Sequence, residues 1–498
     1  MRVPKSQRGP FTPMRYEATI EDCLVVDGEV PAGLHGGFYR NGPTWRRPAK
    51  QGCDTAYTMD GMVQGLVFRE GRIEFRNRWV RTPKFLAEEK AGRALFEWSD
   101  AGFGDWRSWG LGDVVRDEHT SGIPQGTNAI NAMPFAGEVL ALGEQGGPPI
   151  ALDPITLETK GIVSWASSLP PGLHEPAHVS DGAFGPHPKW DESTGELWGC
   201  TYRDQIPYMS VHCVKPDGSV RTRHLDDGPY PAVAHDMWLT ETYAVVAFAP
   251  FIQDRSRIAR GTSIYGWDTS LPTVLALVRR DDIDGTVRWI EGDFDPQWVM
   301  HTLSANEIDG TIVLDGPIFD APPFMTDDRY QPGQDYIPFW QVATSCVGRW
   351  TVDLEKGKAT SERLGDRPVE LPKIDERFWG QPYEWGFYLA GEPVKDGMRM
   401  NSILRRNVHS GKEDVYTVES KRPVGVYESA FVPRTADAPE GDGFLITPVA
   451  HFTESRSDFL IFDTDDIPAG PIARIELPFL VGWTPHGHWM DFREHGPS

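Results

Sequence analysis

Residues 65–82 read GLVFREGRIEFRNRWVRT, and this stretch decides the fold class. Apolar and polar residues alternate on both sides of Glu70-Gly71, which is typical of two β-strands joined by a tight turn. The pattern returns, each time with a glycine-containing turn, in MPFAGEVLAL (133–142), VRWIEG (287–292), EIDGTIVLDG (307–316), GRWTVDLEKGK (348–358) and NVHSGKEDVYTV (407–418). So many hairpins in one chain without a linker-like break predict an all-β protein, either a β-propeller or a large barrel. No segment repeats at a fixed period, so the pattern alone leaves the number of blades open.

Helical signals are scarce, and the strongest covers residues 82–96, TPKFLAEEKAGRALF, with Pro83 near its first turn. The stretch 92–112 that follows is rich in tryptophan and phenylalanine. We interpret residues 82–112 as a cap or lid within a single domain that spans residues 1–498. The aromatic side chains could line a substrate tunnel, dip into a membrane or simply pack on the β-structure.

The composition excludes several classes of function. Apolar residues make up 39% of the 498 residues, as in an ordinary globular protein, and 49 basic against 72 acidic residues give a net charge of −23. That charge argues against binding to nucleic acid or to an anionic membrane surface. No apolar run approaches the roughly 18 residues that cross a bilayer, so we expect no stable membrane insertion and at most transient lipid contact. The five cysteines are scattered and odd in number, which predicts reduced thiols and a cytoplasmic location.

Four of the fourteen histidines lie against apolar, strand-like stretches. Three are His187, His235 and His301, and the fourth lies in TPHGHW (484–489). In a propeller the chain termini usually meet, so we expect TPHGHW on or beside the closing strand. The separations along the chain are too long for a local metal motif, and spacing alone leaves open one shared metal site or four unrelated histidines. Polar or turn-like surroundings predict solvent-exposed side chains for His119, His212, His224, His409 and His495.

Nine motifs in order along the chain resemble the carotenoid cleavage oxygenase superfamily, which includes apocarotenoid oxygenases, lignostilbene dioxygenases and isoeugenol-cleaving enzymes. They are GGFYRNGP (36–43), MDGMV (59–63), RNRWVRTPKF (76–85), GEQGGPPIALDPITLETKG (143–161), HPKWDESTGEL (187–197), AHDMWLTETY (234–243), VELPKID (369–375), ESAFVPRTADAPEGDGFL (428–445) and the terminal HGHW (486–489). The resemblance implies a seven-bladed β-propeller with one Fe(II) on its axis and a loop and short-helix cap over the substrate tunnel.

The same resemblance assigns the metal site. Matching by motif gives the iron ligands His187, His235, His301 and His486. His301 stands in HTLSANE, whose spacing departs from the family pattern, and it is the only histidine between residues 236 and 408. His488 falls at the variable position of the terminal motif, which implies a supporting or structural role. The glutamates that orient the imidazoles match Glu144, Glu370 and Glu428, and the sequence leaves their pairing with the histidines open.

The implied reaction needs O2 and a small apolar or aromatic alkene. Four neutral imidazoles leave Fe(II) its full charge and up to two open positions, and Thr127 matches a threonine that crowds one of them. Cleavage of a conjugated C=C bond would then give two carbonyl products. Relatives that act on phenols activate the substrate hydroxyl with a lysine, and Gly143 stands at that position here. Their tyrosine has no counterpart in 92–112 either.

The two missing residues favour an apocarotenoid or similar conjugated alkene over a stilbene or phenylpropenoid such as isoeugenol. Two other functions stay open. One is an isomerase or hydrolase on the same iron scaffold, and the other is a non-catalytic binding propeller.

Overall fold

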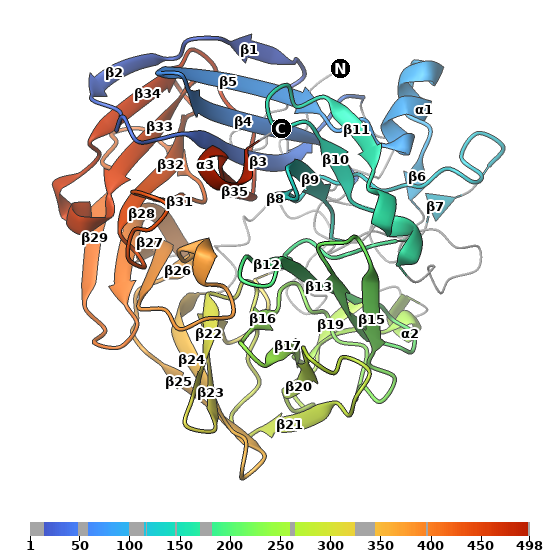
Figure 1. Cartoon of the computed structure of the whole chain (residues 1–498). Helices are drawn as coiled ribbons and strands as arrows, with labels where there is room; N and C mark the ends of the chain where they lie inside the picture. Colours follow the sequence, from blue (N-terminus) through green and yellow to red (C-terminus); the bar gives the residue numbers. More distant parts are fainter. Residues whose placement is uncertain are drawn as a thin grey trace.

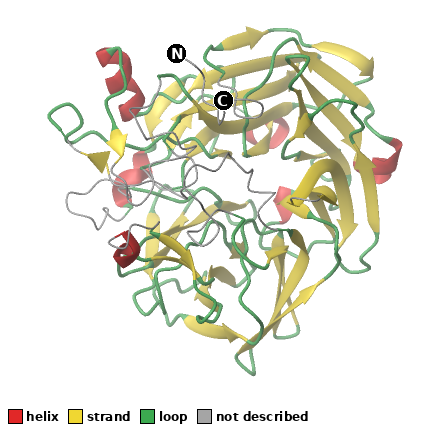
Figure 2. Cartoon of the chain, turned by 180° about the vertical axis from the view of Figure 1, so that it is seen from behind, coloured by secondary structure: helices red, strands yellow, loops and turns green. Residues whose placement is uncertain are grey.

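The computed structural model describes residues 14–47, 58–98, 114–115, 117–144, 147–169, 182–258, 264–323, 344–394 and 397–496. β-Sheets follow one another around a central axis in sequence order, so the ribbon runs once round the molecule from blue to red (Figure 1). Strands dominate the view from behind as well (Figure 2). The predicted all-β, propeller-like architecture is therefore confirmed.

Three sheets are antiparallel and four-stranded. The first comprises β11 (Thr159–Ile162), β10 (Ile150–Leu152), β9 (Glu138–Leu142) and β8 (Asn131–Phe135). The second comprises β12 (Lys189–Asp191), β13 (Glu196–Tyr202), β14 (Met209–Val214) and β15 (Val220–His224). The third comprises β26 (Val369–Lys373), β27 (Trp385–Val394), β28 (Gly397–Asn407) and β29 (Glu413–Thr417).

An eight-stranded sheet lies between the second and third of these sheets (Figure 1). One antiparallel half comprises β16 (Trp238–Leu239), β17 (Tyr243–Phe248), β20 (Val274–Arg279) and β21 (Arg288–Gly292). The other comprises β25 (Lys358–Arg363), β24 (Ser345–Asp353), β23 (Thr311–Phe319) and β22 (Ser304–Ile308). The halves meet through a parallel pairing of β21 with β25 that involves two residue pairs.

Both ends of the chain complete the remaining two large sheets. The order β1 (Ala18–Ile20), β5 (Arg72–Trp79), β4 (Asp60–Arg69), β3 (Gly36–Thr44) and β35 (His486–Asp491) joins the last strand to the N-terminal hairpins. The other sheet joins β2 (Leu24–Gly28) to β34 (Ala473–Leu477), β33 (Arg456–Asp463), β32 (Gly443–His451) and β30 (Val424–Val426), with β31 (Ala430–Pro433) also paired to β32. TPHGHW thus enters the closing strand, as expected.

Local sequence explains the hairpins. Glu70 and Gly71, the two residues between β4 and β5, both have positive φ, 52° and 73°. Such a two-residue turn matches the twist of antiparallel strands, and glycine takes the positive φ without steric cost. Ala136-Gly137 and Asp309-Gly310 repeat the arrangement, with φ of 50° and 79° and of 47° and 77°.

Helices are few and short. The predicted helix is α1 (Pro83–Ala91); the Thr82 side chain accepts the Phe85 N–H at its start, and Gly92 ends it with φ 70°. The other helices within the described residues are α2 (Arg255–Ile258), α3 (Phe492–His495) and the 3₁₀ turns η3 (Ser164–Ser168), η6 (Glu376–Phe378) and η7 (Thr464–Ala469). Two-stranded pairs form from β6 (Glu97–Trp98) with β7 (Val114–Val115), and from β18 (Phe251–Gln253) with β19 (Tyr265–Trp267).

Most of the aromatic stretch 92–112 of the predicted cap lies outside the described residues, because the description breaks off after residue 98. Within the described part of the chain, no helix is both long enough and apolar enough to span a bilayer. The four cysteines that the structure describes are buried and unpaired, in agreement with the prediction of free thiols.

Candidate metal centre

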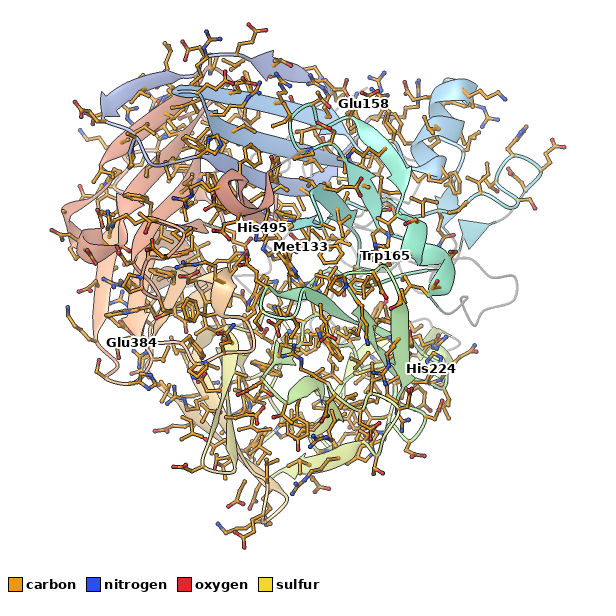
Figure 3. All side chains as sticks on the ribbon, viewed as in Figure 1. Met133, Glu158, Trp165, His224, Glu384 and His495 are labelled. Atoms are coloured by element: carbon orange, nitrogen blue, oxygen red, sulfur yellow. The ribbon has the colours of Figure 1, made fainter. Side chains whose placement is uncertain are left out.

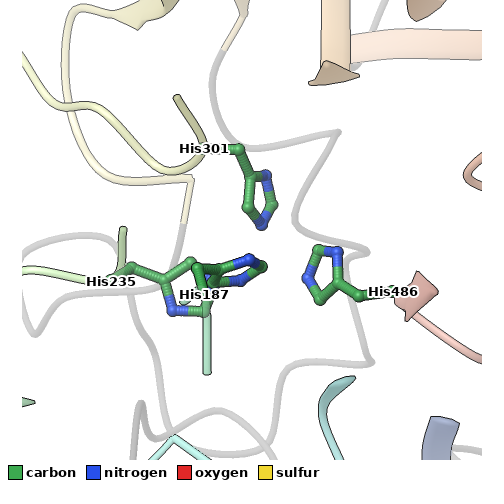
Figure 4. A group of neighbouring side chains, drawn as sticks. All are labelled: His187, His235, His301 and His486. Carbon is green, nitrogen blue, oxygen red and sulfur yellow. The ribbon is translucent and has the colours of Figure 1, made fainter. Parts of the chain in front are cut away.

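The four predicted imidazoles meet on the axis of the molecule (Figure 4). One ring nitrogen of each lies within 4.8 Å of those of the other three, and Nε2 of His187 lies 3.0 Å from Nε2 of His235. Each histidine stands at or just before the innermost strand of a different sheet or half-sheet, ahead of β12, β16 and β22 and at the first residue of β35. This placement explains the long spacing along the chain, because equivalent points of successive sheets converge on the axis.

Each predicted glutamate lies against a different imidazole. The Nδ1 atoms of His235, His301 and His486 lie 2.6 Å from Glu144 Oε2, 2.5 Å from Glu370 Oε2 and 3.1 Å from Glu428 Oε1. A carboxylate at Nδ1 fixes the proton on that atom and leaves the Nε2 lone pair for a metal. His187 has no glutamate partner of this kind among the described residues. The pairing left open by the sequence is therefore resolved.

The surroundings of His187 and His486 favour the neutral imidazole, which is the form that binds a metal. Burial lowers the pKa of His187 well below its usual value, and repulsion by the other three imidazoles lowers this pKa further. Burial likewise lowers the pKa of His486 to about 3. Burial alone would also lower the pKa of His301, but the adjacent Glu370 carboxylate outweighs it and raises that pKa.

A cation would complete this arrangement. Nε2 of His301 is buried and has no hydrogen-bond partner among the residues that the structure describes, which is costly unless a ligand uses its lone pair. A cluster of imidazoles suits a first-row transition metal such as Fe(II). The residues present therefore fit the predicted ion.

His488 does not belong to the group of four imidazoles. Its Nδ1 lies 2.7 Å from Glu376 Oε1, and its Nε2 lies 3.1 Å from Asn131 Nδ2. Thr127 is buried before β8, and its carbonyl accepts the Gly61 N–H. Its proposed role beside the metal stays a prediction.

The other histidines follow the sequence analysis with one clear exception. His119 and His409 are exposed, while His224, at the outer edge in Figure 3, and His495, near the axis, are half-buried. The prediction for His212 is wrong. It is buried in β14, where its ring nitrogens lie 2.9 Å from the hydroxyls of Thr201 and Thr222, so cross-strand hydrogen bonds replace water.

Sequence reasoning missed a tyrosine behind the first glutamate. The Tyr202 hydroxyl, from the last residue of β13, donates a 2.6 Å hydrogen bond to Glu144 Oε1, while Glu144 Oε2 holds His235. A single tyrosine at the end of a strand carries no sequence signal for such a role.

We expect Tyr202→Phe to weaken metal binding by about tenfold, because partners behind a metal ligand typically contribute 10–100-fold in affinity. Titration of the metal-free protein with Co(II) measures this change. Tyr265→Phe, a buried tyrosine in β19, serves as the control and should bind Co(II) like the wild type. Equal affinities for all three proteins would contradict a role for Tyr202.

Comparison with known proteins agrees with this geometry. Residues 11–491 match the family model described as RPE65, retinal pigment epithelial membrane protein. The chain is 31% identical to the isoeugenol monooxygenase of Pseudomonas nitroreducens over 97% of both chains. It is also 31% identical to the lignostilbene-alpha,beta-dioxygenase isozyme III of Sphingomonas paucimobilis, covering 97% of this chain and 96% of that protein.

Solved structures give the same picture. A lignostilbene dioxygenase of Pseudomonas brassicacearum superposes with a TM-score of 0.81 at 29% identity, covering 98% of this chain and 99% of the other. A variant of the apocarotenoid oxygenase of Synechocystis, at 22% identity and 96% coverage of both chains, has the same fold with a TM-score of 0.77.

Proposed function

The chain belongs to the RPE65 family, and from this premise we propose that it is a non-heme Fe(II) oxygenase that cleaves a conjugated C=C bond with O2. The observation that carries the proposal is the cluster of four imidazoles, three of them held by carboxylates at Nδ1. We assign all four as iron ligands and Thr127 as a residue beside an open coordination position. A purely binding propeller would have no use for so many converging lone pairs.

Each part of the proposed site has a separate task. The iron, when bound, supplies the activation of O2. The glutamates keep the proton on Nδ1 of their histidines, so that the Nε2 atoms stay available as ligands. Burial excludes water from the imidazoles and so strengthens every electrostatic interaction at the site. One alkene and one O2 give two carbonyl products, with one oxygen atom in each if the reaction is a dioxygenation.

We further propose that the whole chain, residues 1–498, is one seven-bladed propeller capped by residues 82–112. Support comes from the eight-stranded sheet, which divides at the short parallel pairing of β21 with β25 into two antiparallel four-stranded halves. Counting each half as a blade adds two to the five other large sheets.

For the substrate we propose an apocarotenoid or similar conjugated alkene whose cleavage does not need an ionised phenol. Gly143 supports this, because the lysine of phenol-cleaving relatives is absent. A stilbene or phenylpropenoid is the second candidate, favoured by the 31% identity to proteins named for isoeugenol and lignostilbene.

The decisive experiment combines metal analysis with turnover. Purified protein is analysed for iron and then incubated in ¹⁸O2 with an apocarotenoid, a 4-hydroxystilbene and isoeugenol. The 4-methoxy analogues of the two phenols are tested in parallel. We expect about one iron per chain, two carbonyl products, and cleavage of substrates without a free phenol. Absence of iron binding would refute the proposal, and label in only one product would replace dioxygenation by monooxygenation.

Restoring the missing lysine tests the substrate argument. A Cβ at position 143 would lie 3.5 Å from the backbone of Asn128, an ordinary contact, so Gly143→Lys should fold. We expect it to raise turnover of a 4-hydroxystilbene by about tenfold or more, since a positioned acid–base group typically contributes at least that much. Turnover of the 4-methoxy analogue should not change. Unchanged rates with both substrates would remove Gly143 from the argument.

A further inference from the structure

A buried cluster of one lysine and two carboxylates lies beside His486. Lys373, the last residue of β26, is buried, and its Nζ lies 3.0 Å from Gly487 O, 3.2 Å from Glu376 Oε1 and 3.4 Å from Glu428 Oε2. A lysine ammonium has three protons to donate; here it donates to Gly487 O and Glu376 Oε1, and it forms an ion pair with Glu428. Lys373 thereby joins β26, η6, the segment before β31 and the closing strand β35.

Lys373 contacts the same two groups, Glu428 and the Gly487 peptide, that lie next to the His486 imidazole. Glu428 holds His486 Nδ1 with Oε1 at 3.1 Å and accepts the Gly487 N–H with Oε2 at 2.8 Å. Lys373 contacts that same Oε2 and also the Gly487 carbonyl. Both backbone polar groups of the residue after His486 are therefore held, one by Glu428 and the other by Lys373.

The other two glutamates are supported differently. Glu144 accepts from the Tyr202 hydroxyl, and Glu370 accepts from the Leu371 N–H at 2.5 Å. Glu428 instead faces a buried cation. An ammonium adds a direct charge–charge attraction to a buried carboxylate, which a neutral donor does not supply. Without the cation, Glu428 would have less reason to remain between His486 and Gly487.

We propose that Lys373 is a positioning residue for the metal centre: it fixes Glu428 and the Gly487 peptide, and through them the orientation of the His486 imidazole. This inference rests on the proposed function, because it takes His486 to be a metal ligand. It adds a residue that touches neither metal nor substrate but sets how well one of the four ligands is aligned. The alternative is that Lys373 only stabilises the fold, like any buried ion pair.

The chain offers a matched control for that alternative. Lys84 is also buried between two carboxylates, with its Nζ 2.7 Å from Asp60 Oδ1 and 3.1 Å from Glu88 Oε2. That triad ties α1 to β4, and neither of its two carboxylates is one of the three supporting glutamates. Lys84→Met and Lys373→Met thus each remove one buried ammonium from a pair of acidic groups.

The test uses the purified full chain, freed of metal, and Co(II) as a spectroscopic probe. Titration gives the Kd, the visible d–d bands report ligand geometry, and thermal melting reports stability. We expect Lys373→Met to raise the Kd for Co(II) about 10–100-fold and to change the d–d bands, as loss of a residue behind a metal ligand typically does. Lys373→Arg, which keeps the charge, should return the Kd to within about tenfold of the wild type. Lys84→Met should lower the melting temperature while its Kd and bands stay those of the wild type.

Each outcome decides the matter. A Kd and spectrum for Lys373→Met that equal those of the wild type would overturn the proposal, as would an equal loss of affinity in Lys84→Met. If Lys373→Met does not fold, Lys373→Gln replaces it, because its amide can still donate to the Gly487 carbonyl without the charge, and the same criteria apply. Failure of the proposed function looks different: Co(II) would then not bind the wild type, or would bind His235→Ala equally well.

Discussion

Replacement of His235 by alanine is expected to empty the metal site and abolish activity. The substitution removes one of the four proposed ligands and leaves the buried Glu144 Oε2, 2.6 Å from the lost ring, without the imidazole, while Oε1 still accepts from the Tyr202 hydroxyl. Removal of one partner from a buried charged pair is strongly unfavourable, so metal affinity and local order should both suffer. We expect iron content to fall from about one per chain to below about a tenth, and alkene cleavage to fall at least about a thousandfold, since removal of a central catalytic group commonly has effects of this size.

Elemental analysis and product quantification measure the two effects. His212→Ala is the matched control, because His212 is equally buried and its two ring nitrogens lie against the hydroxyls of Thr201 and Thr222. We expect this variant to lose stability and to keep its iron and its turnover per iron. Full activity in His235→Ala would remove that residue from the ligand set.

Much of the fold could be predicted from the sequence because the signals were local. Period-two alternation and glycine turns identified hairpins such as β4–β5 and β8–β9, and Pro83 marked the start of the helix, which ends at Gly92 and not at residue 96. The order of sheets around the axis depends on contacts between distant segments, which no local pattern contains. The prediction that His212 is exposed was wrong for the same reason. The polar residues that bind its ring, Thr201 and Thr222, are its partners inside the sheet and do not mark a surface.

The candidate site, too, could be predicted from the sequence only in part. Motifs with a family resemblance pointed to the four histidines and three glutamates that the structure brings together, whereas their spacing along the chain could not. The pairing of each glutamate with one histidine is a property of the assembled axis and was visible only in the structure. Tyr202 and Lys373 support the glutamates from the ends of β13 and β26, and no residue type or spacing sets them apart in the sequence.

Substitution of Gly487, which lies between His486 and His488, is expected to lower both the stability of the protein and its metal affinity. A Cβ at position 487 would lie 2.3 Å from the Tyr39 carbonyl oxygen and 2.6 Å from Arg40 Cγ, so β35 could not keep its place beside β3. Gly487→Ala should therefore cost about 1–3 kcal/mol of unfolding free energy, the usual range for overpacking a buried site. It should also weaken metal binding, because the Gly487 N–H holds Glu428 and its carbonyl accepts from Lys373.

Chemical denaturation and Co(II) titration separate the two consequences of Gly487→Ala. Gly365→Ala provides the control, since a Cβ at Gly365 would meet no atom within 4 Å, and we expect its stability and affinity to match the wild type. A lower stability with unchanged affinity would mean that β35 shifts without moving His486. That result would contradict the expected link between the position of β35 and metal binding. If both fall together, the strand that closes the ring is also the element that sets the geometry of the fourth ligand. The glycine of TPHGHW then has a physical reason: it allows the close approach of β35 to β3 that brings His486 to the axis.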